Sequence, residues 1–191
     1  DGMDQDFFGV AIDMDGNRLV AGVRTSDPDS IFNAGAAYIF ERHESDWQFK
    51  QKLVAPNPDV SHFYGESVAI EGDWIFVTEP SNDDKATGNG AVHVYKYQEG
   101  VWGFSQTLYP SKTQSFQFFG WDVFLSKDEA IIGAPRDDQV DVQAGASYVF
   151  RLEDGRWAQR QKLVPPSDIS SFFGTVAAFD DDYLVIGSPT D

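Results

Sequence analysis

An aromatic residue followed by glycine recurs four times along the chain at nearly equal intervals, and this repeat constrains the fold more than any other feature. The four pairs are Phe8-Gly9, Tyr64-Gly65, Phe119-Gly120 and Phe173-Gly174. Neighbouring glycines of these pairs are 54 to 56 residues apart. A regular period of this length is typical of a protein assembled from repeated structural units.

Three further landmarks keep a fixed order between these pairs. Thirteen residues after each glycine, an apolar run contains Gly22, Thr78, Gly133 or Gly187. Next comes a segment that starts with small residues and ends with an aromatic one, at Gly35–Phe40, Gly90–Tyr95 and Gly145–Phe150. A tryptophan then follows, with leucine six residues later, at Trp47, Trp102 and Trp157. The constant order indicates three complete repeats and the start of a fourth.

Each repeat predicts four short strands. The first strand follows the aromatic-glycine pair, as in residues 66–70, and ends in a tight turn such as Glu71-Gly72-Asp73. The second is a nearly continuous apolar run, such as Ala130-Ile131-Ile132, which indicates burial on both faces. The fourth alternates in polarity, which suits a strand with one face in water. No segment has a convincing helical period.

Repeated four-stranded sheets are typical of a β-propeller, so residues 1–191 are predicted to form part of one all-β propeller. The predicted blades are residues 7–61, 62–116 and 117–171, followed by a half blade at 172–191. Glycine in the aromatic-glycine pair would allow neighbouring backbones to approach closely or φ to be positive. The half blade is expected to pair with strands outside this sequence.

The composition excludes several classes of protein. The chain has 31 acidic against 14 basic residues, so its net charge is −17, and no basic face is expected for nucleic acid. Hydrophobic residues make up 41%, enough to bury a core. No apolar run is long enough for a membrane helix, and the absence of cysteine excludes disulfides and thiolate sites.

The landmarks resemble the FG-GAP repeats of the integrin α-subunit propeller. The third repeat shows both motifs that give this family its name, at Phe119-Gly120 and at Gly133-Ala134-Pro135. The resemblance covers residues 7–190 and is closest to integrin-α-like repeats of secreted bacterial and algal proteins. It implies a seven-bladed propeller, usually extracellular or at the cell surface, that contacts protein or glycan ligands. It also implies that the remaining blades come from the same or another chain.

Integrin-type blades often carry a calcium loop between their first two strands, but the corresponding turns here are too short for the ligands that Ca²⁺ prefers. Asp13-Met14-Asp15-Gly16-Asn17 comes nearest to the pattern, and we expect it to be a hairpin turn. A divalent cation such as Ca²⁺ could instead be bound by Asp137, Asp138 and Asp141, or by Asp83 and Asp84, because clustered carboxylates repel one another without a cation.

Long acidic loops between the second and third strands are expected at the same end of the propeller as the loops between blades. In the integrin propeller, this face contacts ligands and the partner subunit. The candidate contact residues are Asp27, Asp29, Phe32, His62, Asn82, Phe116, Trp121 and Asp168. The alternative is that these acidic loops are simply solvated.

No constellation of residues predicts catalysis, and no catalytic residue is assigned. His93 takes the place of Tyr38 and Tyr148 in the other repeats, so we interpret it as a strand residue rather than a base. The favoured function is therefore an extracellular adhesion or interaction module without catalysis. Two alternatives stay open: a propeller that accompanies or forms a secreted glycan- or lipid-processing enzyme, and a structural unit of a surface filament or sheath.

Overall fold

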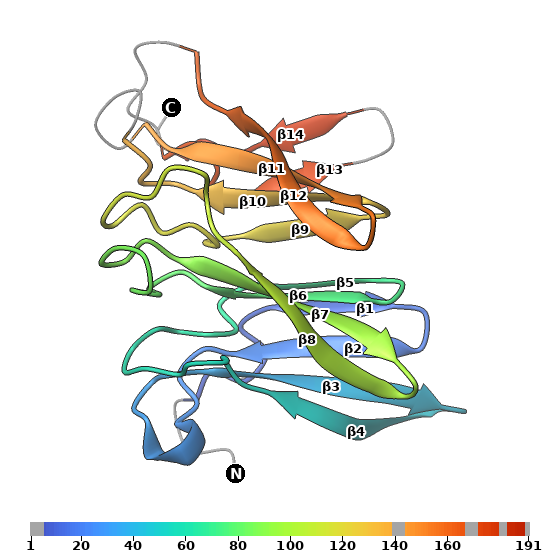
Figure 1. Ribbon diagram of the computed structural model, residues 1–191. Helices are drawn as coiled ribbons and strands as arrows, with labels where there is room; N and C mark the ends of the chain where they lie inside the picture. The colour runs from blue at the N-terminus through green and yellow to red at the C-terminus, as the bar shows by residue number, and fades with distance from the viewer. Residues whose placement is uncertain (1–5, 139–143, 167–171, 180–182, 190–191) are drawn as a thin grey trace.

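The computed structural model describes residues 6–138, 144–166, 172–179 and 183–189. These parts of the chain form three four-stranded antiparallel sheets and one two-stranded sheet (Figure 1). The all-β prediction is confirmed, and the four strands of each large sheet pair in chain order. The described residues do not close into a ring.

Each large sheet, which we call a blade, lies within one of the predicted repeats. The first blade contains β1 (Ile12–Asp15), β2 (Arg18–Val23), β3 (Ala36–His43) and β4 (Asp46–Leu53), with a short 3-10 helix η1 (Pro28–Ser30) between β2 and β3. The second contains β5 (Val68–Glu71), β6 (Trp74–Glu79), β7 (Ala91–Gln98) and β8 (Val101–Leu108). The third contains β9 (Val123–Ser126), β10 (Glu129–Ala134), β11 (Ala146–Glu153) and β12 (Arg156–Leu163). The two-stranded sheet is β13 (Ala177–Phe179) with β14 (Leu184–Ile186).

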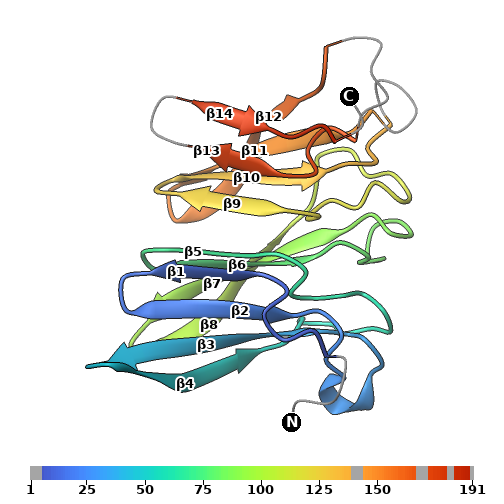
Figure 2. The same ribbon diagram turned by 180° about the vertical axis from the view of Figure 1, so that it is seen from behind.

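The sheets are stacked face to face, with their first strands close together along one side of the stack (Figures 1 and 2). Consequently the hydrophobic core lies between blades. Strand β6 shows this directly: Phe76 belongs to a buried cluster shared with the third blade, whereas Ile75 and Val77 belong to one shared with the first. All six residues of β6 are buried, which confirms the predicted burial of second strands on both faces.

The aromatic-glycine pair is the point where one blade meets the next. Tyr64 is completely buried, and its amide donates to the carbonyl of Ala34 in the preceding blade at 2.9 Å. Gly65 has φ of +88°, and a Cβ at this position would lie 2.4 Å from the carbonyl oxygen of Ala36. Both the backbone conformation and the close approach therefore require glycine, as the sequence predicted.

Aspartates of the first strand bind the next blade. The Asp13 carboxylate accepts a 2.8 Å hydrogen bond from the amide of Ile70, and Asp15 accepts one of 2.8 Å from the amide of Gly72. The segment that comes nearest to a calcium loop is the predicted β1–β2 hairpin, with Asp15 opposite Arg18. Its carboxylates satisfy amides on the first strand of the neighbouring blade and its turn.

Glutamines of the fourth strand make a second contact between blades. The Gln51 side chain donates to the Trp102 carbonyl at 2.8 Å and accepts from the Trp102 amide at 3.0 Å. Gln106 repeats both bonds with Trp157, each at 2.9 Å. A side-chain amide thus pairs with the neighbouring backbone as a β-strand would.

Candidate functional site

One end of the stack collects the loops that the sequence predicted to lie together. In Figure 1 the loops between the second and third strands lie on the same side as the loops between blades. Backbone hydrogen bonds join the two sets, from Ser61 to Phe32 at 2.9 Å and from Phe116 to Thr87 at 2.7 Å. We call this end the rim, and it consists of residues 24–35, 54–67, 80–90, 109–122 and 135–138.

Large apolar side chains are exposed at the rim. The exposed fraction is 61% for Phe32, 56% for Phe116 and 41% for Trp121. Asp27 and Asp29 are exposed as well, although Asp27 also accepts the amide of Asn33 at 2.7 Å. These five residues therefore lie where a ligand could reach them, whereas Asp168 lies outside the described residues.

Two other predicted contact residues are not at the surface. His62 and Asn82 are buried beneath the rim, and both side chains are bonded to Glu79. Both side chains are buried and bonded to Glu79, so the structure does not present them at the rim surface as the sequence predicted. The positive φ values of Ser61 and Phe63, 59° and 57°, shape the loop on either side of His62.

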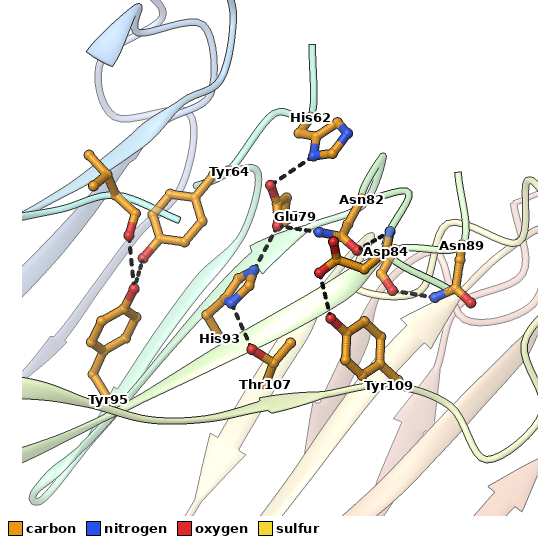
Figure 3. Close-up of polar contacts among 12 residues, drawn as sticks. His62, Tyr64, Glu79, Asn82, Asp84, Asn89, His93, Tyr95, Thr107 and Tyr109 are labelled. Carbon is orange, nitrogen blue, oxygen red and sulfur yellow. Dashed lines mark hydrogen bonds and ion pairs between the residues drawn. The ribbon is translucent and has the colours of Figure 1, made fainter. Parts of the chain in front are cut away.

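A buried polar cluster is centred on Glu79, at the end of β6 (Figure 3). Its carboxylate is completely buried and has three side-chain partners. They are His62 Nδ1 at 3.1 Å, His93 Nε2 at 2.7 Å and the Asn82 amide nitrogen at 2.8 Å. On its other ring nitrogen, His93 meets the Thr107 hydroxyl at 3.2 Å. One carboxylate thus joins the loop between blades to β7 and to the loop that follows β6.

The cluster shifts the ionisation of its members. Burial alone would raise the pKa of the Glu79 carboxyl, but hydrogen bonds from His62 and His93 outweigh burial and hold this pKa below its ordinary value. The hydrogen bond to Glu79 raises the pKa of His62 against the opposing effect of burial. The negative charges of Glu79, Asp59 and Asp83 act in the same direction. Both shifts thus favour the charged form of their group, a carboxylate at Glu79 and an imidazolium at His62.

Further hydrogen bonds surround the cluster. The Tyr64 hydroxyl donates to that of Tyr95 at 2.9 Å, and Tyr95 donates to the Val54 carbonyl at 3.0 Å. Burial raises the pKa of Tyr95 to about 12, so both phenols stay neutral. Tyr109 donates to the Asp84 carboxylate at 2.7 Å. These bonds join the loop between blades to β7, and the segment after β8 to the loop after β6.

Comparison with known families matches the FG-GAP repeat at residues 1–40, 47–95 and 102–150, which together make up well over half of the chain. The chain belongs to the FG-GAP repeat family. A search of curated proteins finds no match to this FG-GAP chain. Within the described ranges, no helix has the length and apolar character needed to cross a membrane.

The third FG-GAP blade holds its buried carboxylate in a different way. Asp137, which corresponds to Asn82, accepts from Lys162 Nζ at 2.7 Å and from the Tyr148 hydroxyl at 2.5 Å. Burial, followed by the hydrogen bond to Asp137, raises the pKa of Tyr148. A lysine therefore neutralises the carboxylate in this blade, where the second blade uses histidine.

The described carboxylates of the predicted cation sites have partners within the protein. Asp137 is turned inward to Lys162, Asp138 accepts from Gln114, and Asp141 lies outside the described residues. Asp83 accepts the amide of Gly88 at 2.6 Å, whereas Asp84 is bonded to Tyr109. Throughout the described ranges, no group of three or more acidic, histidine or cysteine side chains is placed to hold a metal ion.

Sequence reasoning missed Glu79, although a signal was present. Glu79 stands where the other complete repeats have Val23 and Ala134, so a carboxylate replaces an apolar residue at a position buried in all three blades. His93, interpreted as a strand residue, is indeed buried within β7. Glu79 is completely buried, and its partners His62 and Asn82 belong to the loops on either side of the β5–β6 hairpin.

Proposed function

We propose that the chain is a non-catalytic interaction module of an extracellular protein and binds protein or glycan ligands through its rim. The observation that carries this proposal is the set of exposed aromatic side chains on anchored loops. Phe116 is exposed although its amide is bonded to Thr87 and its φ is +60°. A large residue in this conformation is uncommon and strained, and such strain concentrates at functional sites.

The aromatic residues of the third blade form a continuous group. Phe118 stacks edge-on against Trp121 with ring centroids 6.2 Å apart, and the Arg136 guanidinium lies 5.2 Å from the Phe118 ring centroid. Exposed aromatic rings offer flat apolar area at little conformational cost, so they suit sugar rings and protein side chains. Rim carboxylates such as Asp27 and Asp29 would favour basic groups or sugar hydroxyls.

Binding to an array of glycans and basic peptides tests this function. We expect the double variant Phe116→Ser/Trp121→Ser to lose the signal of the native chain. Phe104→Ser is the matched control, because Phe104 is 52% exposed but lies on β8, away from the rim. Equal binding by the double variant and the native chain would contradict the proposal.

We also propose that further blades cover the exposed face of the first blade and complete a seven-bladed ring. Matched positions within the chain support this. The exposed fraction is 60% for Ile12, but 5% for Val68 and 6% for Val123, which occupy the same position in the next two blades. The preceding blade buries those two valines. Ile12 places an apolar side chain at the same position on the first blade. The partner that best fits this exposed face is therefore another FG-GAP blade.

The last sheet of the stack, β13 with β14, also exposes an apolar face. Val185 in β14 is 66% exposed, whereas Val20 and Phe76 at the matched positions are completely buried by the blade that follows. Strand β13 contacts β9 and β10, and β14 is the outer strand of its sheet. The expectation that residues 172–191 pair with further strands remains part of this proposal.

A further inference from the structure

We propose that His62, Glu79 and His93 form a pH-dependent clasp that holds the rim between the first two blades and loosens as the pH rises above neutral. This inference rests on the proposed function only in taking the rim as the binding face. The clasp itself is defined by contacts within the chain (Figure 3).

The clasp adds to the backbone hydrogen bonds and the Tyr64–Tyr95 contact that also hold the loop between the first two blades. His62 belongs to the loop between blades, whose neighbours Ser61 and Phe63 donate backbone hydrogen bonds to Phe32 and Asn33 of the first blade. Its Nδ1 lies 3.1 Å from Glu79 of the second blade. The imidazole therefore attaches a loop that rests on the first blade to the interior of the second.

The charge of this attachment depends on pH. Glu79 is completely buried, and a buried carboxylate is strongly unfavourable unless a cation compensates it. Its ring partner His62 has a pKa raised by the hydrogen bond to Glu79, so this imidazole loses its charge as the pH rises through that raised value. Once the His62 imidazole is neutral it can still donate a hydrogen bond, but the carboxylate has lost that cation.

The surrounding groups do not replace that cation. The loop between blades contributes Asp59, and the loop after β6 contributes Asp83 and Asp84, all of them acidic. Other side chains near the clasp carry neutral hydroxyl groups. They are Tyr95 on β7, Thr107 on β8, and Tyr64 and Tyr109 in the adjoining loops. Lys85 is the basic residue of the loop, and its Nζ lies 5.0 Å from the Tyr109 ring centroid.

The direction of the pH effect follows from the pKa shifts of His62 and Glu79. The raised pKa of His62 gives stability that is present at acidic pH and is lost as the pH rises through that raised value. The lowered pKa of Glu79 gives stability that is lost only as the pH falls through its lowered value. The clasp is therefore tightest between these limits, in mildly acidic solution.

The third blade provides an internal comparison. Gln117 takes the place of His62, Ala134 that of Glu79 and Tyr148 that of His93. Its buried carboxylate, Asp137, is instead paired with the primary amine of Lys162. At these positions the third blade therefore has no histidine.

Hydrogen exchange tests the clasp on the native chain at pH of about 6 and about 8.5, after correction for intrinsic exchange. The reporters are the bonded amides of Ser61, Phe63 and Tyr64, and their counterparts are those of Phe116, Phe118 and Phe119. We expect the first three to lose protection several-fold at the higher pH while the second three do not. An equal change in both sets would overturn the proposal.

His62→Gln, which introduces the residue found in the third blade, should abolish this pH dependence. His43→Gln is the matched control, since His43 is exposed at the end of β3, and it should retain the dependence. If the His62 variant does not fold, an NMR titration of the native chain decides: His62 must titrate above the ordinary histidine range. Titration at or below that range would overturn the clasp. These readouts need no ligand, so a failed binding experiment leaves them interpretable.

Discussion

Lys162 and Asp137 show how a single buried charge depends on its partner. Asp137 is 1% exposed, and the lysine nitrogen lies 2.7 Å from its carboxylate. Lys162→Met would leave the carboxylate buried without this cation, so we expect a loss of about 3 kcal/mol in the free energy of unfolding, measured with urea.

The control for that variant is Lys52→Met, at the same position of the first blade. There Ser26 replaces Asp137, and Lys52 Nζ lies 5.3 Å from the centroid of the Tyr38 ring. We expect a loss of about 1 kcal/mol or less for this contact. Similar losses for the two lysines would contradict the assigned role of Asp137.

The residues of the rim also show what a sequence can predict about a site. The exposure of Phe32, Phe116 and Trp121 could be predicted, because loops at the end of a propeller lie in solvent. The burial of His62 and Asn82 could not. In irregular backbone no period of two determines the direction of a side chain, and here positive φ values on either side of His62 shape the loop.

At the scale of strands, the glutamines of β4 and β8 are expected to fix neighbouring blades laterally. Gln51→Leu removes two hydrogen bonds to the backbone of Trp102, whose indole is buried. We expect a loss of about 1–3 kcal/mol, because the amide and carbonyl of Trp102 lose their partner. Gln161→Leu is the control, since this glutamine of β12 is exposed. Urea unfolding of both variants provides the comparison, and equal losses would exclude the lateral role.

Most strands could be predicted from the sequence because each blade must bury two apolar faces and keep tight turns. The paired carboxylates of β1 could not be assigned their role in that way. Asp13 and Asp15 resemble part of a cation loop, but their partners are amides of Ile70 and Gly72, more than fifty residues along the chain. Contacts of this kind depend on how one blade stacks on the next, which the pattern of a single repeat does not specify.

At the scale of the whole molecule, an aspartate at the same position of two blades should have very different consequences. Ile12→Asp places a charge on a side chain that is 60% exposed, so we expect a change within about 1 kcal/mol. Val68→Asp places it in the core between the first two blades, where an unpaired charge should prevent folding. Circular dichroism and thermal unfolding distinguish these outcomes.

That pair of variants also tests whether the face of Ile12 is an interface. When a further FG-GAP blade is joined ahead of the first, Ile12→Asp should become as damaging as Val68→Asp is in the chain alone. If the substitution stays harmless in the extended chain, the added blade does not cover this face, and the proposed completion of the ring is wrong.

The stacking of blades at aromatic-glycine pairs is the claim on which the rim and the clasp depend, and the stability of Gly65→Ala tests it most directly. A Cβ at Gly65 meets the Ala36 carbonyl oxygen of the preceding blade at 2.4 Å, whereas one at Gly72, whose φ is also positive at +56°, meets nothing within 4 Å. We predict that Gly72→Ala costs about 1 kcal/mol, for the left-handed backbone alone, and that Gly65→Ala costs more than about 3 kcal/mol in urea unfolding. Equal costs for the two variants would contradict the stacking of blades at this glycine.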